Sequence, residues 1–405
     1  MRSHTASGEP LKGVEALERS GLHEQYRNRL LYHLEAGLLY HLAGKYRESN
    51  RFLESAEWIS DEMYTRSLSL EAAALATSDN LLPYRGKYYD YLFINYYKLL
   101  NYLHLGSLES ALVEVRRINH KLALFGEENA FLRWVTAVLH RHSGEYSSAF
   151  IDYLRAYRAY EKTYPEKFGV QMPRFLAEDI AVFCAETRHP RSLEFPPEVL
   201  ASRRPPPPEY GSVIFIVETG FSPHKYEKRV DAEVPVSGRE KDGEKVRETY
   251  ILSISVPEYA PRRDTVTGVR LSLNGSETRL ELAEDTGAAA VHYFEEERGR
   301  IIARAAARAA AKYAAYRTAR GDDPENLLRR ILGSVVNIAG SATERADTRS
   351  WLTLPDRIFM ARKYLPPGEH NFSVDILTEE GRESSSGGTF SLDEGELKFV
   401  LLRRF

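Results

Sequence analysis

Acidic, basic and aromatic side chains that could carry out chemistry together are densest between residues 337 and 368. In this stretch Asp347, Arg349 and Trp351 alternate along the chain, so an extended backbone would place all three on one side. Glu218 is a second candidate, because a carboxylate at the end of a buried strand can lie in a cleft. An enzyme built from these residues would use Glu218, Asp347 and Arg349 at a junction between two domains.

These residues do not belong to a known catalytic motif. It contains no G-x-S-x-G, Walker, G-x-G-x-x-G or C-x-x-C pattern, and His224 and His292 have no metal-ligand spacing around them. Glu218 has no second carboxylate or histidine at a recognisable spacing. We therefore predict that the chain is not an enzyme and that it uses no cofactor and no metal.

The stretch around Trp351 also has a structural interpretation. Asp347 and Arg349 are expected to form an ion pair that anchors a loop, and with Trp351 to tie the C-terminal sheet to the helix that precedes it. The segments DRIFMARKYL, PPG and HNFSVDIL then predict a strand, a turn and a second strand, and so a β-hairpin. In this interpretation the stretch stabilises the fold and is not an active site.

The bulk composition limits the classes of partner. The chain has 405 residues, of which 43% are hydrophobic and 28% charged, and such a length predicts about two or three domains. Its net charge of −3 does not favour nucleic acid as a partner. Its one cysteine, Cys184, excludes an intramolecular disulfide.

No apolar run approaches the roughly 18 residues of a membrane span, and no signal-peptide pattern is present. We expect a cytosolic protein, or a mature exported one whose leader was removed.

A helical pattern extends from about Leu30 to Ala185 and contains a sub-pattern that occurs three times. Each copy begins with a glycine, at Gly44, Gly106 and Gly144, and a small residue follows five positions later. The glycine is expected to end one helix, and the small residue to let the next helix approach it closely. At these positions the chain resembles the second half of a tetratricopeptide (TPR) repeat. The copies are 62 and 38 residues apart, so insertions or irregular helices are expected between them.

The break between the first two copies is rich in tyrosine, as in the segment SDNLLPYRGKYYDYL. A TPR array leaves a concave surface that commonly binds a peptide or another protein, so we expect a protein or peptide partner there. The alternative is that the helices only support the C-terminal half. The partner-binding or structural candidates of the helical half are Tyr84, Tyr88, Tyr89, Asn101, Tyr102, Glu114 and Arg117.

A proline-rich segment with the run PPPP divides the chain, since such a run favours a stiff spacer. We predict a flexible segment over residues 1–29, a TPR-like helical domain over 30–188, a linker over 189–210 and a β-rich α/β domain over 211–405. The fold class is therefore α+β: an all-α solenoid and a β-rich domain with an inserted Ala-rich helix. On that helix Arg304, Arg308 and Lys312 share one face, which we expect to be solvated.

Several motifs together resemble a family of uncharacterised bacterial TPR-containing envelope proteins, which are often lipoproteins. The resemblance covers most of the chain, from about residue 30 to 374, and implies an architecture and a compartment but no reaction. A leader and a lipid-accepting cysteine are not visible at the N-terminus. The matching positions are Pro83, Tyr84, Gly86, Asn101 to Gly106, Glu114, Arg117 and the run ADTRSWLTLP from Ala346 to Pro355.

The leading functional prediction is an interaction scaffold or adaptor of the bacterial cell envelope, on its periplasmic side. Peripheral or lipid-anchored membrane association is expected if a leader was removed. A cytosolic TPR scaffold that regulates a partner is the first alternative. The second alternative is an enzyme with a cleft between the two halves, near Glu218, Asp347 and Arg349.

Overall fold

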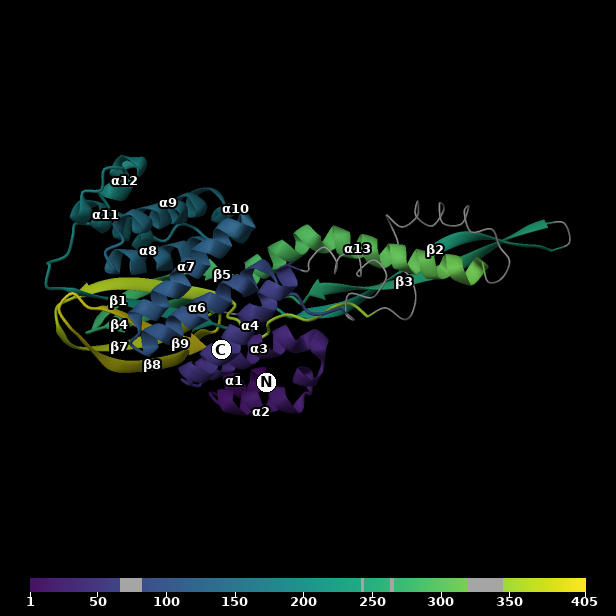
Figure 1. The fold of residues 1–405 in the computed structure, drawn as a ribbon, viewed down its shortest axis with the longest axis horizontal. Coiled ribbons are helices and arrows are strands. Elements are labelled where there is room, and N and C mark those ends of the chain that lie inside the picture. The colour runs from purple at the N-terminus through teal and green to yellow at the C-terminus, as the bar shows by residue number, and fades with distance from the viewer. Residues whose placement is uncertain (66–81, 242–243, 263–265, 319–344) are drawn as a thin grey trace.

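The computed structural model describes residues 1–65, 82–241, 244–262, 266–318 and 345–405 (Figure 1). Helices dominate the first half of the chain and strands the second, so the predicted α+β class is confirmed. The helices of the first half are α1 (Arg2–Ala6), α2 (Pro10–Arg19), α3 (Arg29–Leu42), α4 (Tyr46–Thr65), α6 (Tyr88–His104), α7 (Leu108–Phe125), α8 (Ala130–His142), α9 (Tyr146–Lys162), α10 (Tyr164–Phe168), α11 (Arg174–Thr187) and α12 (Pro197–Leu200), with 3₁₀ turns η1 (Leu22–Glu24), η2 (Tyr26–Asn28) and η4 (Ser192–Glu194).

Three helix hairpins, α3/α4, α6/α7 and α8/α9, carry the three copies of the sequence pattern. Gly44, Gly106 and Gly144 follow the first helix of each hairpin and have positive φ angles of 70°, 71° and 80°, which favour glycine. The small residues five positions later are completely buried. In the first hairpin, a Cβ atom added to Gly37 would lie 2.6 Å from the Leu53 side chain. The predicted turns and the close approach of the helices are therefore confirmed.

Residues 1–29, predicted to be flexible, instead contain α1, α2 and two 3₁₀ turns. Val14 and Leu17 of α2 are buried in a small cluster with Ala36 and Leu39 of α3. Arg2 reaches the C-terminal half, where its Nε donates a hydrogen bond to the Leu352 carbonyl at 2.8 Å. The segment differs from the prediction because the apolar side of α2 packs on α3, the next α-helix, and because Arg2 contacts the distant C-terminal half.

The second half contains a seven-stranded sheet with the order β8-β7-β4-β5-β6-β1-β9. Strand β1, which lies next to the edge strand β9, is buried along its whole length and pairs antiparallel with β6 and parallel with β9. The segments DRIFMARKYL and HNFSVDIL, which were predicted to be strands, coincide with β6 and β7. The strands of this sheet are β1 (Gly211–Thr219), β4 (Val266–Leu273), β5 (Ser276–Asp285), β6 (Arg357–Leu365), β7 (Gly368–Thr378), β8 (Gly381–Leu392) and β9 (Leu397–Arg404).

The prediction that the strands before and after the PPG turn pair with each other is wrong. The two strands exist as β6 and β7, but β6 pairs with β5 and β1, whereas β7 pairs with β4 and β8. The hairpin of β4 and β5 separates them in the sheet. The turn signal fixed where the strands end, but not which strands become neighbours.

An arm extends from this body, formed by strands β2 (Lys225–Lys241) and β3 (Glu244–Tyr259) and by helix α13 (Thr286–Thr318) (Figure 1). The two strands pair antiparallel in a sheet of their own. Helix α13 includes the predicted Ala-rich segment and runs beside the strands. Arg308 is buried, contrary to the solvated face that we predicted, while the Lys312 side chain lies outside the described part.

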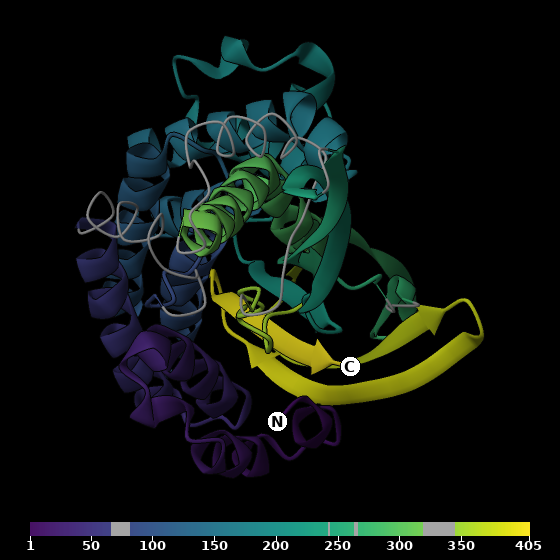
Figure 2. The same cartoon turned by 90° about the vertical axis from the view of Figure 1, so that its right-hand side faces the viewer.

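The helices form an arc around the sheet (Figure 2). One hydrophobic core joins the two parts, because residues of the helix hairpins cluster with Ile214 and Ile216 of β1 and with Met360 of β6. Tyr160 of α9 also donates a hydrogen bond at 2.6 Å to the carbonyl of Ala283 in β5. The side of the helical array that faces inward is therefore covered by the chain's own sheet.

Candidate functional site

Glu218 lies at the end of β1 and is completely buried between the helices and the sheet. Its carboxylate accepts hydrogen bonds from the hydroxyls of Tyr96 and Tyr97, at 3.3 and 3.1 Å, and from Arg403 Nη1 at 3.0 Å. Burial raises the pKa of Glu218 although Arg403 and the hydroxyls oppose it. A carboxylate enclosed in this way links α6 to β1 and β9.

Asp347 and Arg349 form the predicted ion pair. Arg349 donates through Nε and Nη2 to the two Asp347 carboxylate oxygens, each at 2.8 Å. Its guanidinium also donates to the carbonyls of Arg27 and Leu82, at 3.0 and 2.9 Å, and lies over the Tyr84 ring. The pair anchors the segment to the N-terminal helical part. The helix that precedes it in sequence, which we predicted to be its partner, lies outside the described residues.

Trp351 is a buried anchor, as predicted, with 1% of its surface exposed. Its ring meets the Tyr97 ring edge to face, with centroids 6.1 Å apart. The next two residues bind Glu35 of α3, whose carboxylate accepts from the Leu352 amide and the Thr353 hydroxyl, each at 2.6 Å. Burial raises the pKa of Glu35 to about 7. Glu35 was not among the predicted site residues; its signal in the sequence is a single acidic residue in the apolar run RLLYHLEAGLLYHL.

The tyrosine and asparagine candidates are mostly inside the molecule. Tyr84 and Tyr89 are buried, and the Tyr84 hydroxyl donates to Asp90 at 2.9 Å. Tyr88 packs edge to face against Phe125 and Tyr293. The Tyr88 ring therefore joins α6 to α7 and to α13, whereas Tyr84 precedes α6 and lines a cavity.

Asn101 is also buried and connects the first two helix hairpins. Its Nδ2 donates to the Ser49 hydroxyl and to Asn50 Oδ1, each at 2.8 Å. Its Oδ1 lies 2.6 Å from His41 Nδ1. Tyr102, one residue further on, is half-buried at the surface of α6.

Glu114 and Arg117 belong to a charged network between α4, α6 and α7. Lys98 Nζ is fully buried and lies 2.7 Å from Glu57 and 3.2 Å from Glu114. Arg117 and Lys121 contact Glu57 at 2.8 and 3.0 Å. Both predicted candidates therefore hold the helices together, although Arg117 also reaches the surface.

A groove of about 560 Å³ lies on the outer surface between α4 and α7. Val113, which lines the groove, is 43% exposed, and Trp58 of α4, one turn beyond Glu54 and Ser55 of the lining, is 63% exposed. On α9, Ile151 is also 43% exposed. Val113 and Ile151 occupy the same position in successive copies of the repeat, seven residues after the glycine. The groove is lined by Asn50, Arg51, Glu54, Ser55, Tyr102, Ser110, Val113, Glu114 and Arg117.

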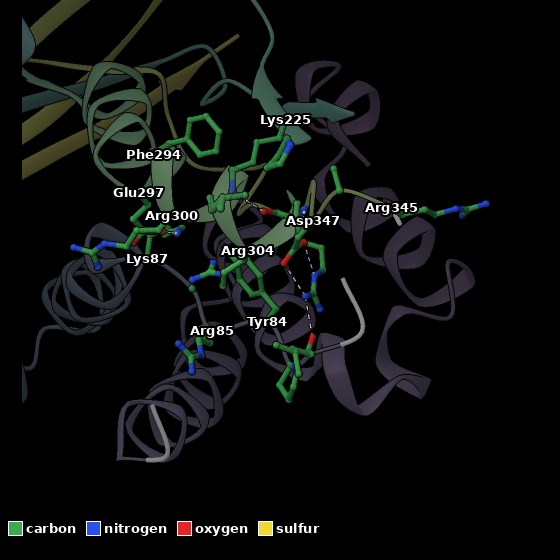
Figure 3. Close-up of a pocket in the computed structure, with 18 of the residues that line it drawn as sticks. Tyr84, Arg85, Lys87, Lys225, Phe294, Glu297, Arg300, Arg304, Arg345 and Asp347 are labelled. Atoms are coloured by element: carbon green, nitrogen blue, oxygen red, sulfur yellow. Dashed lines mark hydrogen bonds and ion pairs between the residues drawn. The ribbon is translucent and has the colours of Figure 1, made fainter. Parts of the chain in front are cut away.

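A second cavity, of about 310 Å³, lies where the arm meets the body (Figure 3). It is formed by the loop before α6, by β2 and β3, by α13 and by the segment around Asp347. Glu218 does not line it, so the structure does not bring Glu218 together with Asp347 and Arg349. Among the described residues, two acidic side chains, Glu297 and Asp347, and eight basic ones line this cavity: Arg85, Lys87, Lys225, Arg300, Arg304, Arg308, Arg345 and Arg349.

No family model, curated protein or solved structure matches this chain, so similarity to known proteins assigns no role to the groove or to the cavity. Among the described residues, no group of three or more His, Cys, Asp or Glu side chains could hold a metal ion. In the same part of the chain, no helix is both long enough and apolar enough to cross a bilayer.

Proposed function

We propose that this protein is an interaction scaffold whose helix hairpins form a TPR-like array. The observation that carries the proposal is the outer groove between α4 and α7, with exposed Trp58 one turn beyond Glu54 and Ser55 of its lining. Exposed tryptophans are rare on surfaces that bind nothing and are enriched at the centres of protein interfaces. We place the partner on this outer surface and not on the concave one, because the chain's own sheet covers the inward side.

The side chains of the groove suit a peptide or a protein surface as the partner. Val113 supplies an apolar wall, while Arg51, Glu54 and Arg117 supply charged groups at its edges. Arg117 and Glu54 lie 3.5 Å apart across the groove and are both partly exposed, so a partner could exchange this weak pair for its own. An apolar centre with a polar rim is the usual arrangement of a non-obligate interface.

The resemblance to bacterial envelope proteins supports an envelope scaffold, and a cytosolic scaffold is the alternative. We do not extend the proposal to catalysis. Glu218 is enclosed by tyrosine hydroxyls and Arg403, whereas Asp347 and Arg349 bind each other. The three residues of the enzyme hypothesis therefore occupy two separate places.

The test compares proteins that the full chain captures from a bacterial envelope extract with those captured by the variant Trp58→Glu plus Val113→Glu. Leu193→Glu is the matched control, because Leu193 is 90% exposed on η4, far along the chain from the groove. The full chain is used because an isolated helical segment would expose the residues that pack on the sheet. We expect the groove variant to lose a partner that the control keeps, with an unchanged melting temperature. Equal capture by all three proteins would refute the outer-surface site.

A further inference from the structure

A third hollow, with a volume of about 300 Å³, lies where helices α8, α9 and α11 meet strands β1 and β6. The segment between α12 and β1, which carries the proline run, passes from the helices to the sheet beside it (Figure 1). The described lining contains Arg141, His142, Glu186 and Arg362 together with three prolines and three tyrosines. None of these residues lines the groove or the cavity beside the arm, so this is a separate candidate site.

Arg141 of α8 has more N–H donors than the chain supplies acceptors for. Its Nη2 donates to the Glu186 carboxylate at 2.5 Å, and its Nη1 donates to the Tyr364 hydroxyl at 3.5 Å, which is long for a hydrogen bond. A guanidinium group has five N–H donors, so these two bonds to described residues leave several of them for a ligand. The Arg141 side chain is 11% exposed, so its contact with bulk water is limited.

Arg362 of β6 is the second arginine of the lining, and it is also short of acceptors. It donates to Asp179 at 3.0 Å and to the Ser212 hydroxyl at 3.2 Å. Its Nε is buried and has no hydrogen-bond partner among the described residues, although buried polar groups nearly always have one. Both arginines therefore favour a ligand that brings hydrogen-bond acceptors into the cavity.

The carboxylate that Arg141 holds is the one that a ligand could replace. The Glu186 side chain is 39% exposed, and Arg141 is its one hydrogen-bond partner among the described residues. An ion pair with an exposed member contributes little to stability, because water and salt compete for it. Asp179 differs, because it is 1% exposed and also accepts a hydrogen bond from Trp134 Nε1 at 2.7 Å. Glu186 can therefore leave Arg141 with little loss of stability, whereas Asp179 stays with Arg362.

Proline and tyrosine rings form the apolar part of the lining. Pro206 to Pro208 contribute three rings, and Tyr146 of α9, which is 50% exposed, contributes another. Tyr364 of β6 is held by the Arg203 guanidinium, 5.0 Å from its ring centroid, and by Asp179, which accepts from its hydroxyl at 3.3 Å. Rings of this kind pack well against a flat apolar group, so we expect the ligand to carry one beside its acceptor atoms.

We propose that this cavity binds a small carboxylic acid with an apolar body, and that the carboxylate of this ligand replaces Glu186 on Arg141. A planar carboxylate matches the guanidinium group through two parallel hydrogen bonds, and it has the same chemistry as the group that it displaces. The volume of about 300 Å³ is at the lower end for a small-molecule site, so the apolar body is about the size of one ring. The proline and tyrosine rings pack against that body.

The experiment titrates benzoate, benzamide and acetate into the full chain at constant ionic strength, followed by calorimetry and thermal unfolding. Benzamide has the shape of benzoate without its charge, whereas acetate has the charge without the ring. We expect benzoate to bind most tightly, about tenfold or more above either of the other two, because it alone can use both the arginine and the rings. Benzoate should also raise the melting temperature.

Two variants of the exchanged ion pair should move the affinity in opposite directions. Arg141→Gln should weaken benzoate binding by about tenfold or more, through the loss of charge-assisted hydrogen bonds. Glu186→Gln removes the competing carboxylate, so it should tighten benzoate binding by about threefold, which a variant that merely folded poorly could not do. Arg191→Gln and Glu194→Gln are the matched controls, because these two residues form an ion pair of 2.5 Å outside the lining of the cavity.

Each part of the proposal has a result that would overturn it. Binding of benzamide or acetate as tight as that of benzoate would overturn the assignment to an apolar carboxylic acid. The exchange at Arg141 would be overturned if Glu186→Gln bound benzoate no more tightly than Glu194→Gln does. The site itself would be overturned if the wild type showed no saturable binding of benzoate, or if Arg141→Gln bound it as tightly as Arg191→Gln does.

Discussion

Glu57 inside the helical array and Glu284 at the interface between helices and sheet are both buried carboxylates, but different groups satisfy them. Inside the array, Glu57 contacts the ammonium groups of Lys98 and Lys121 at 2.7 and 3.0 Å. At the interface, Glu284 of β5 accepts hydrogen bonds from the Tyr164 hydroxyl at 2.8 Å and from Asn129 at 3.2 Å. One carboxylate has cationic partners and the other has neutral donors.

The pKa values of the two groups move in opposite directions for this reason. Burial raises the pKa of Glu57, but Lys121 and Lys98 outweigh it and lower the pKa to about 2. Burial raises the pKa of Glu284 to about 8, because the hydrogen bonds from Tyr164 and Asn129 only partly oppose it. The comparison teaches that burial alone does not set the charge of a carboxylate. Glu57 therefore keeps its charge inside the array, whereas Glu284 at the interface holds a proton that it loses only as the pH rises through about 8.

The largest loss of stability should come from a cavity in the core between the helices and the sheet. Trp351→Ala removes a side chain that is 1% exposed and leaves a cavity beside Tyr97, so the free energy of unfolding should fall by about 4 kcal/mol. Denaturant unfolding measures this change. Trp58→Ala is the control, because it deletes the same group from an exposed position and should cost less than about 0.5 kcal/mol. Equal losses would mean that Trp351 is not the anchor that its contacts indicate.

Removing the central cation of the array should be the next largest effect. Lys98→Met keeps the apolar stem but leaves Glu57 and Glu114 without the buried ammonium, so unfolding should become easier by about 3 kcal/mol. Lys12→Met is the control, because Lys12 pairs with Glu9 on the surface. If chemical denaturation gave the same stability for both variants, the network would not depend on its buried lysine.

The pH dependence of stability should identify the interface carboxylates. The folded-state pKa of Glu284, about 8, is above the ordinary value of 4.5, so the folded protein keeps a proton that the unfolded chain loses. Its contribution is fully present below about pH 4.5 and is lost as the pH rises to about 8. Glu284→Gln cannot lose the proton, so it should be more stable than the wild type at pH 8, by on the order of 2 kcal/mol.

Unfolding curves at pH 5 and pH 8 measure this difference for the wild type and Glu284→Gln. Glu35, with a pKa of about 7, should add a dependence of the same sign in both proteins, so subtracting one from the other isolates Glu284. A stability difference between the two proteins that did not grow with pH would show that Glu284 is ionised in the folded state.

The smallest effect tests close packing inside the array. A Cβ atom on Gly37 would meet Leu53 Cδ2 at 2.6 Å, so Gly37→Ala should lower stability by about 1 kcal/mol despite its better helix propensity. At Gly299 of α13 an added Cβ meets nothing within 4 Å, so Gly299→Ala should instead stabilise the protein by up to about 1 kcal/mol. Thermal unfolding of the two variants should show shifts of opposite sign; a stabilising Gly37→Ala would exclude a tight contact between α3 and α4.

The candidate site was predictable from the sequence only in part. The ion pair of Asp347 and Arg349 and the anchoring role of Trp351 follow from residues within five positions of one another, and the structure has both. The Arg304 and Arg308 spacing indicated a basic helix face, but not that it would line a cavity. Nothing in the sequence near Lys225 indicated that it would line the same cavity.

The sequence by itself determined the local elements of this protein. Gly44 and its equivalents end helices because a positive φ angle is a property of one residue, and the apolar runs form strands because their pattern is local. Only the tertiary structure decided which elements meet. It separated β6 from β7 and paired Glu35 with Thr353 across 318 residues. Such contacts depend on how whole helices and strands pack, and no short-range spacing encodes that.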